Sequence, residues 1–204
     1  MDLETEFGAM DIYLFDQLLR RRITARDRIF DAGCGEGRNL VYFLRVGWDA
    51  WGADADPDAI AHVRALAANL APGFPANDRF RVETLDHLSF PAASASVVLS
   101  SAVLHFARSD DEFDAMLEGS WRCLAPGGMF FCRLASTIGF ERHVRQLGHT
   151  GRRYHLPDGT DRYLVDEPFL MDRTRELGGL LLDPLKTTIV QNQRAMTTWV
   201  VRRS

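Results

Sequence analysis

One stretch decides the fold of this chain: Ile29-Phe30-Asp31-Ala32-Gly33-Cys34-Gly35-Glu36-Gly37-Arg38-Asn39. It starts as a short apolar strand that runs to Asp31 and then enters a turn with glycine at positions 33, 35 and 37. Glycine lets a backbone approach a ligand closely, and the first N–H groups of the following helix have no partner within it. Because open α/β sheets bind ligands beyond the carboxyl ends of their strands, we predict a ligand site here. The candidate binding residues of this stretch are Asp31, Gly33, Cys34, Gly35 and Asn39.

The charges around the glycines indicate the sign of the ligand. Dinucleotide sites also use Gly-rich turns, but with the spacing G-x-G-x-x-G, whereas this turn has G-x-G-x-G preceded by an acid. Asp31 and Glu36 would repel the diphosphate of a dinucleotide and attract a ligand that carries an ammonium and a sulfonium. The sequence therefore favours S-adenosylmethionine over NAD.

A second acid follows the next expected strand. A carboxylate at such a strand end accepts hydrogen bonds from both ribose hydroxyls of a bound nucleoside. Asp54 stands at the strand end, whereas Asp56 precedes Pro57 and is better placed as the N-cap of a helix. We predict that Asp54 holds the ribose, with Asp56 or a purely structural role as the alternatives.

Apolar periodicity predicts the order of the elements. Expected strands alternate with expected helices, and this alternation is typical of an α/β, doubly wound parallel sheet. The last two β-rich segments have no helix between them and should pair antiparallel. Residues 136–165 read as irregular, and a long irregular segment is often a lid. The expected strands are 28–32, 48–53, 79–84, 96–100, 129–134, 180–190 and 196–202, and the expected helices are 9–23, 37–46, 56–70, 110–124 and 166–177.

Four segments together resemble the class I S-adenosylmethionine-dependent methyltransferases. They occur in family order over about residues 28–134, namely Asp31–Gly37, Gly52–Pro57, Ser100–His105 and Leu124–Gly128. The resemblance implies a Rossmann-like, seven-stranded sheet in the order 3-2-1-4-5-7-6 with an antiparallel last strand. It also implies that Gly33 and Gly35 lie against the methionine part of the cofactor and that Asp54 binds the ribose. The further cofactor-binding residues that it implies are Ala55, Leu85, Ser100 and Tyr13.

The third-strand region departs from the family pattern. It often reads G-D-A-x-x-L-P-F in the family, whereas here it reads Glu83-Thr84-Leu85-Asp86-His87-Leu88-Ser89-Phe90. Thr84 therefore replaces the acid that commonly holds the adenine amino group. The size of the chain and its late irregular segment are similar to small-molecule methyltransferases of the tellurite-resistance type.

Two residues are candidates for binding or deprotonating the methyl acceptor. Methyl transfer from a sulfonium is an in-line displacement, so the protein contributes alignment and exclusion of water. A general base matters only when the acceptor still holds its proton. His105 is the best-placed base, with a histidine that hydrogen-bonds a loop as the alternative. Arg133 ends the fifth strand, where it would either bind an anionic acceptor or form a structural ion pair.

Composition limits the remaining function classes. The net charge of -4 argues against a nucleic-acid partner, no segment reaches the ~18 apolar residues of a membrane span, and the N-terminus lacks the pattern of a signal peptide. We expect a single domain over residues 1–204, cytoplasmic, monomeric or homodimeric, without a metal, that methylates a thiol, a chalcogen oxyanion or another small polar or acidic compound. The rival hypotheses are an NAD-dependent oxidoreductase and a non-catalytic S-adenosylmethionine-binding or regulatory protein.

Overall fold

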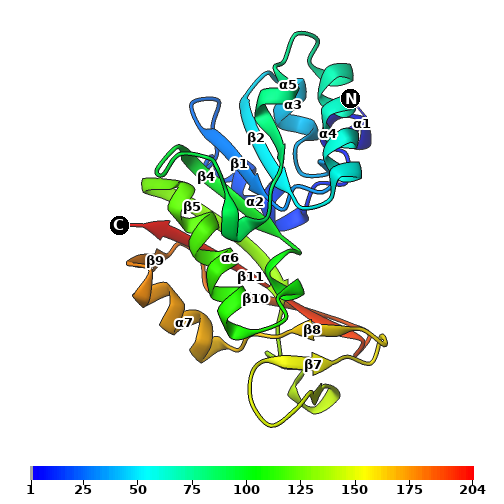
Figure 1. The fold of residues 1–204 in the computed structure, drawn as a ribbon, viewed down its shortest axis with the longest axis vertical. Coiled ribbons are helices and arrows are strands. Elements are labelled where there is room, and N and C mark those ends of the chain that lie inside the picture. Colours follow the sequence, from blue (N-terminus) through cyan, green and yellow to red (C-terminus); the bar gives the residue numbers. More distant parts are fainter. Residues whose placement is uncertain (1) are drawn as a thin grey trace.

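The computed structural model describes residues 2–204, and a long twisted sheet runs through the molecule (Figure 1). Its strands follow the order β3-β2-β1-β4-β5-β11-β10, and β9 pairs with the far end of β11. The strands β1 to β5 are parallel, whereas β11 runs antiparallel to both β5 and β10. This confirms the predicted order 3-2-1-4-5-7-6, in which β11 is the seventh strand and β10 the sixth. The bounds are β1 (Arg28–Ala32), β2 (Asp49–Asp54), β3 (Phe80–Val82), β4 (Ala95–Ser101), β5 (Leu124–Ala135), β9 (Gly179–Leu181), β10 (Lys186–Val190) and β11 (Arg194–Arg203).

Helices cover both faces of this sheet because its strands are apolar on both sides. In β5, Phe130 and Cys132 pack into the core under α6 and α7, and Phe131 between them packs into the core under α2, α3 and α4. This alternation follows from the two-residue period of a strand. The helices are α1 (Leu3–Phe7), α2 (Ile12–Leu19), α3 (Val41–Arg45), α4 (Pro57–Leu70), α5 (Ala76–Arg79), α6 (Asp110–Cys123) and α7 (Glu167–Glu176), with short 3-10 turns η1 (Leu85–His87), η2 (Leu104–Phe106) and η3 (Glu141–His143).

The expected N-terminal helix over residues 9–23 is wrong in its length. Asp11 caps α2 by accepting a hydrogen bond from the Tyr13 N–H at 3.0 Å, so the helix starts at Ile12. It ends at Leu19, and Arg21 then adopts a left-handed conformation with φ 57°. A separate short helix, α1, precedes it.

The expected helix over residues 37–46 also starts later than predicted. Gly37 has φ +84°, which no helical residue adopts. The Asn39 amide oxygen accepts a hydrogen bond from the Asp11 N–H at 3.0 Å. The turn is therefore held to the N-terminal segment, and the helix forms only from Val41 onward.

The segment 136–165 is not irregular throughout. It forms a small antiparallel sheet of β6 (Arg145–Gln146), β7 (Arg153–His155) and β8 (Asp161–Tyr163). A bridge between Ser136 and Val165 closes the segment at its base. The sequence did not reveal these strands because each has at most three residues, too few for a period of two to stand out.

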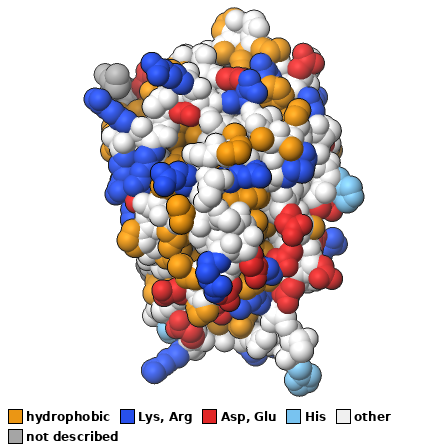
Figure 2. Space-filling view, turned by 90° about the vertical axis from the view of Figure 1, so that its left-hand side faces the viewer, with side chains coloured by type: hydrophobic (Ala, Val, Ile, Leu, Met, Phe, Trp, Pro, Cys, Tyr) orange, Lys and Arg blue, Asp and Glu red, His pale blue; other side chains and the backbone are white. Residues whose placement is uncertain are grey.

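The parallel strands end on the right of the molecule in Figure 1 and start on the left, where the C-terminus lies. Figure 2 shows the left-hand face, across whose middle Lys and Arg side chains gather in a band. The Gly-rich turn lies at the opposite edge, so this basic band is separate from the predicted ligand site. None of the helices within residues 2–204 is long and apolar enough to cross a membrane.

Candidate active site

A cavity of about 660 Å³ opens at the carboxyl ends of β1, β2 and β4. This is the edge at which open α/β sheets bind ligands. Its walls come from the Gly-rich turn, the end of β2, the segment around η1, the loop after β4 and the first turns of α6. The lining residues include the predicted Gly33, Cys34, Gly35, Asn39, Asp54, Ala55 and Leu85.

The Gly-rich turn is clamped to the end of β2. The Gly33 and Cys34 N–H groups both donate to the Ala53 carbonyl oxygen, at 2.8 and 2.9 Å. A side chain at position 33 would collide with Val103, whereas position 35, with φ +51°, faces open space. Gly33 thus allows close packing, and Gly35 leaves room in the cavity for a ligand to approach the backbone.

Asp54 links the turn to the next helix. One of its carboxylate oxygens accepts from the Gly35 N–H at 2.8 Å, and the other accepts from the Asp56 N–H at 3.0 Å. An ionised carboxylate has about four acceptor sites, so both oxygens can also accept ribose hydroxyls. Asp56 itself caps α4 through the Asp58 N–H at 2.9 Å. Asp54 therefore lines the cavity while Asp56 acts as a helix cap, and the ribose role of Asp54 stays a prediction.

Asp31 is a buried carboxylate whose Oδ2 lacks a hydrogen-bond partner among the described residues. Only 1% of the residue is exposed. Burial raises the pKa of Asp31 to about 7, an effect that the charge of Arg38 opposes and that of Asp54 reinforces. Since a buried unpaired charge is costly, a cationic ligand beside this carboxyl would stabilise its ionised form.

The segment that departs from the family pattern forms the next wall. Thr84, Leu85 and Asp86 all line the cavity, together with Glu83. A hydrogen bond from the Thr84 side chain lowers the pKa of Asp86 from its ordinary value, so it favours the ionised form of this acid. The wall therefore keeps acids directly beside Thr84, where the sequence had indicated only the loss of one.

Three predicted cofactor residues, Asp31, Ser100 and Tyr13, are not among the residues that line the cavity. Asp31 is buried at the end of β1, directly before the part of the Gly-rich turn that does line it. Ser100 is fully buried within the sheet, and Ser101 takes the place in the cavity wall. The Tyr13 hydroxyl lies 2.6 Å from Thr188 Oγ1, which holds this side chain against β10.

His105 is buried and neutral. Its Nδ1 accepts a hydrogen bond from the Ala135 N–H at 3.2 Å, and burial lowers the pKa of His105 to about 4, with the charges of Arg162, Arg133 and Arg194 acting in the same direction. A neutral imidazole that accepts at Nδ1 carries its proton on Nε2. Neither nitrogen is then free to take a proton, which agrees with the alternative of a histidine that hydrogen-bonds the backbone.

Arg133 forms an ion pair. Its Nη1 lies 3.2 Å from Oδ2 of Asp11, whose side chain is fully buried. The Ser101 hydroxyl donates to the same oxygen at 3.1 Å and accepts from Arg38 Nη2 at 2.8 Å. Sequence reasoning missed Arg38 and Ser101 as cavity residues, although both lie inside or beside quoted motifs. The sequence did not reveal that Asp11 binds Arg133 and Ser101, because no local pattern indicates contacts between residues so far apart in the chain.

The sheet order, the clamped Gly-rich turn and the acid-lined cavity define a Rossmann-like α/β domain of the methyltransferase class. Residues 30–132 match the family described as "Methyltransferase domain". The chain belongs to this family.

Two curated relatives and a solved structure extend the comparison. The chain is 35% identical over 101 residues to the uncharacterized methyltransferase YodH of Bacillus subtilis, a match that covers 50% of this chain and 40% of that protein. It is 32% identical over 125 residues to a probable S-adenosylmethionine-dependent methyltransferase of Mycolicibacterium smegmatis, covering 61% and 44%. The chain thus spans less than half the length of these relatives. The structure of Burkholderia thailandensis 1,6-didemethyltoxoflavin-N1-methyltransferase, with its bound 1,6-didemethyltoxoflavin and S-adenosylhomocysteine, superposes with a TM-score of 0.69 at 19% identity, covering 100% of this chain and 81% of that one.

Proposed function

We propose that this protein transfers the methyl group of S-adenosylmethionine to a small-molecule acceptor and releases S-adenosylhomocysteine. The single observation that carries the proposal is Asp31, a buried carboxylate at the end of β1 whose Oδ2 has no hydrogen-bond partner among the described residues, next to a turn with open space at Gly35. A cationic cofactor supplies the missing charge, and a dinucleotide diphosphate does not. Membership of the methyltransferase domain family supports the same conclusion.

The residues of the cavity fit this cofactor. Gly33 and Gly35 would lie beside its methionine part, the Asp54 carboxylate would accept its ribose hydroxyls, and Leu85 would pack against its adenosine. Thr84 and Asp86 supply polar groups at the far wall. When bound, the cofactor supplies a methyl group activated by a positively charged sulfur.

The chain's own contribution is alignment and exclusion of water. The segment 136–165 is proposed as the lid of the acceptor side, where Arg153 Nη1 donates to the Ala107 carbonyl oxygen at 3.2 Å and so holds β7 to the loop after η2. The proposed acceptors are thiols, chalcogen oxyanions and small polar or acidic compounds, and the likeness to the tellurite-resistance type belongs to this proposal.

Calorimetric titration tests the proposal, with S-adenosylmethionine, S-adenosylhomocysteine and NAD as parallel ligands. Binding of the first two and not of NAD is the expected result. A folded protein that binds neither adenosyl ligand would overturn it.

A second function is favoured by one observation. His105 is neutral and already accepts a hydrogen bond, and a domain whose predicted base is occupied suits a protein that binds S-adenosylmethionine without turnover. Formation of S-adenosylhomocysteine with any acceptor eliminates this alternative.

Asp54→Ala is expected to weaken S-adenosylhomocysteine binding by at least about tenfold, because ribose hydrogen bonds are lost from a carboxylate that also holds the Gly-rich turn. Asp56→Ala is the matched control. It removes the cap of α4 and is expected to lower stability by about 1 kcal/mol while leaving the affinity unchanged. Equal affinities in the two variants, measured by calorimetry, would refute the ribose assignment.

His105→Gln is expected to keep turnover within about threefold of the wild-type value, since glutamine can also accept the Ala135 hydrogen bond. Removal of a working general base costs about 100-fold or more. Initial rates of S-adenosylhomocysteine formation separate the two cases, and a loss of the larger size would restore His105 as the base.

A further inference from the structure

Positive charge gathers on the acceptor side of the cavity. Arg162 on β8, Arg133 at the end of β5 and Arg194 at the start of β11 all act electrostatically on His105. Arg162 also touches the cavity wall, because its guanidinium lies 4.8 Å from the ring centre of Phe106. Phe106 lines the cavity and is 55% exposed. A ligand that enters over Phe106 therefore meets Arg162.

Arg162 and Arg194 remain without an ion pair within residues 2–204, and of these two only Arg162 packs on a residue that lines the cavity, Phe106. Arg133 is already paired with Asp11. Arg162 donates to the carbonyl oxygen of its neighbour Asp161 at 2.8 Å and forms no ion pair in the part of the chain that the structure describes.

The acids on this side of the cavity have other partners. The Asp161 carboxylate lies 2.8 Å from His155 Nδ1. Asp158 is within electrostatic reach of Arg162 but accepts hydrogen bonds from Thr160. Glu112, which lines the cavity on this side, is paired with Arg108 at 2.9 Å. None of these acids forms an ion pair with Arg162 within residues 2–204, so its guanidinium can still take a carboxylate ligand directly, although the charge of Asp158 partly offsets its own.

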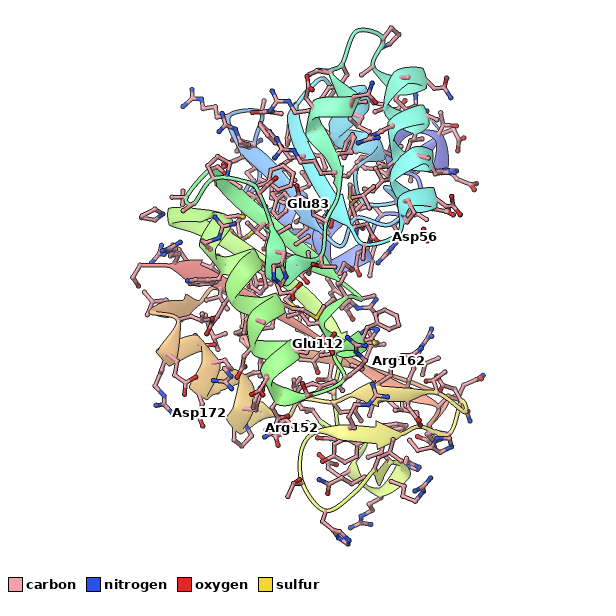
Figure 3. The ribbon with its side chains drawn as sticks, viewed as in Figure 1. Asp56, Glu83, Glu112, Arg152, Arg162 and Asp172 are labelled. Atoms are coloured by element: carbon pink, nitrogen blue, oxygen red, sulfur yellow. The ribbon has the colours of Figure 1, made fainter. Side chains whose placement is uncertain are left out.

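The opposite wall has the opposite charge. Figure 3 shows Glu83 and Asp56 above the indentation on the right of the molecule and Arg162 below it. Four acids of the Gly-rich turn, the end of β2 and the segment around η1 line the cavity, namely Glu36, Asp54, Glu83 and Asp86. A cationic donor suits this acidic wall, and the site on the other side is suited to an anion.

We propose that the methyl acceptor is a small carboxylic acid, bound as its carboxylate through Arg162 beside Phe106, a proposal that rests on the proposed function. In the transfer, the bond between sulfur and methyl breaks with its electron pair kept on sulfur, and a lone pair of the carboxylate oxygen forms the new bond to carbon. The products are a neutral thioether and a neutral methyl ester, so charges cancel and no proton has to be removed. Such an acceptor explains why a methyltransferase can leave His105 without a free nitrogen.

Paired ligands test the proposal on the protein saturated with S-adenosylhomocysteine. The calorimetric probes are benzoate with benzamide, phenylacetate with phenylacetamide, malonate with malonamide, and inorganic phosphate. At least one carboxylate is expected to bind about tenfold or more tightly than its amide. Arg162→Gln is expected to abolish this preference, whereas Arg145→Gln, which removes an exposed lid charge on β6, retains it.

Other outcomes overturn the proposal. Equal affinity for carboxylates and their amides would overturn it, as would a preference for the carboxylate that survives in Arg162→Gln. Binding of inorganic phosphate alone, or no binding of any carboxylate at concentrations up to about 10 mM, would overturn it as well. The affinity of Arg162→Gln for S-adenosylhomocysteine confirms that this variant is folded. A wild-type protein that does not bind S-adenosylhomocysteine defeats the proposed function as well, whereas one that binds it without any preference for anions defeats only this inference.

Discussion

Asp31→Asn is expected to make the ligand-free protein more stable at neutral pH and to weaken its binding of S-adenosylmethionine. The pKa of this carboxyl rises from 3.8 to about 7 because of burial. Between these values the unfolded chain is ionised while the folded chain keeps the proton, so stability falls as the pH rises through this window and stays low above it. At about 1.4 kcal/mol per pKa unit, the full shift corresponds to roughly 4 kcal/mol.

Melting temperatures and calorimetry measure both effects. The free energy of unfolding of Asp31→Asn is expected to exceed that of the wild type by about 2 kcal/mol at pH 8, less than the roughly 4 kcal/mol of the full shift because the amide is also buried. This difference corresponds to a rise in melting temperature of about 4–8 °C at pH 8, and it shrinks toward pH 4. The affinity for S-adenosylmethionine is expected to fall by about tenfold or more, while that for the uncharged 5′-methylthioadenosine changes little. Asp78→Asn, at an exposed position, is the control and should change neither the melting temperature nor the affinity for S-adenosylmethionine. A variant that melts like the wild type at pH 8, or binds S-adenosylmethionine equally well, would show that Asp31 is not the cation partner.

Gly119→Ala is expected to destabilise the protein, although alanine is normally the better helix former by about 1 kcal/mol. Gly119 lies within α6, and an added methyl group would overlap the carbonyl oxygen of Leu85 in η1. Backbone cannot move aside as a flexible side chain can, so either the helix or the cavity wall at Leu85 has to shift. Overpacking of this kind costs about 1–3 kcal/mol.

The measurement combines a melting curve with a titration. The melting temperature is expected to fall by roughly 2–12 °C. S-adenosylhomocysteine binding is expected to weaken as well, because Thr84, Leu85 and Asp86 belong to the displaced wall. Glu118→Ala changes the neighbouring exposed position of the same helix. Its free energy of unfolding should stay within about 0.5 kcal/mol of the wild-type value. A more stable Gly119→Ala variant would show that the space between α6 and η1 is larger than the structure has it.

Local patterns predicted much of the sheet and of the donor side. The apolar runs of β1 and β4, the glycines at 33 and 35 and the pair Asp56-Pro57 act through their own backbone or nearest neighbours. For this reason, the cap of α4 and the lining of the cavity by the Gly-rich turn agree with expectation. The strand order came from the resemblance to a family rather than from periodicity, which carries no information on which strands are neighbours.

The acceptor side was predicted least well. Successive side chains of β4 point to different surroundings. Ser100 lies in the core, and Ser101, one position further along the strand, lines the cavity wall. The strand pattern could not decide between them because the whole run is buried on both faces. The start of α3 shifted for a related reason, the hydrogen bond between Asn39 and Asp11, which joins two segments that are separate in the sequence.

The sequence by itself determined the class of fold, the place of the Gly-rich turn and the negative charge of the donor site, because each depends on residues close together in the chain. Only the tertiary structure decided that Asp11 takes up Arg133, that the Nδ1 of His105 is occupied by Ala135, and that Arg162 lies over Phe106. These contacts join the N-terminal segment, the ends of β4 and β5 and the small sheet of residues 145–163. Their chemistry depends on burial and on the distances between charges, and neither quantity exists until the chain is folded.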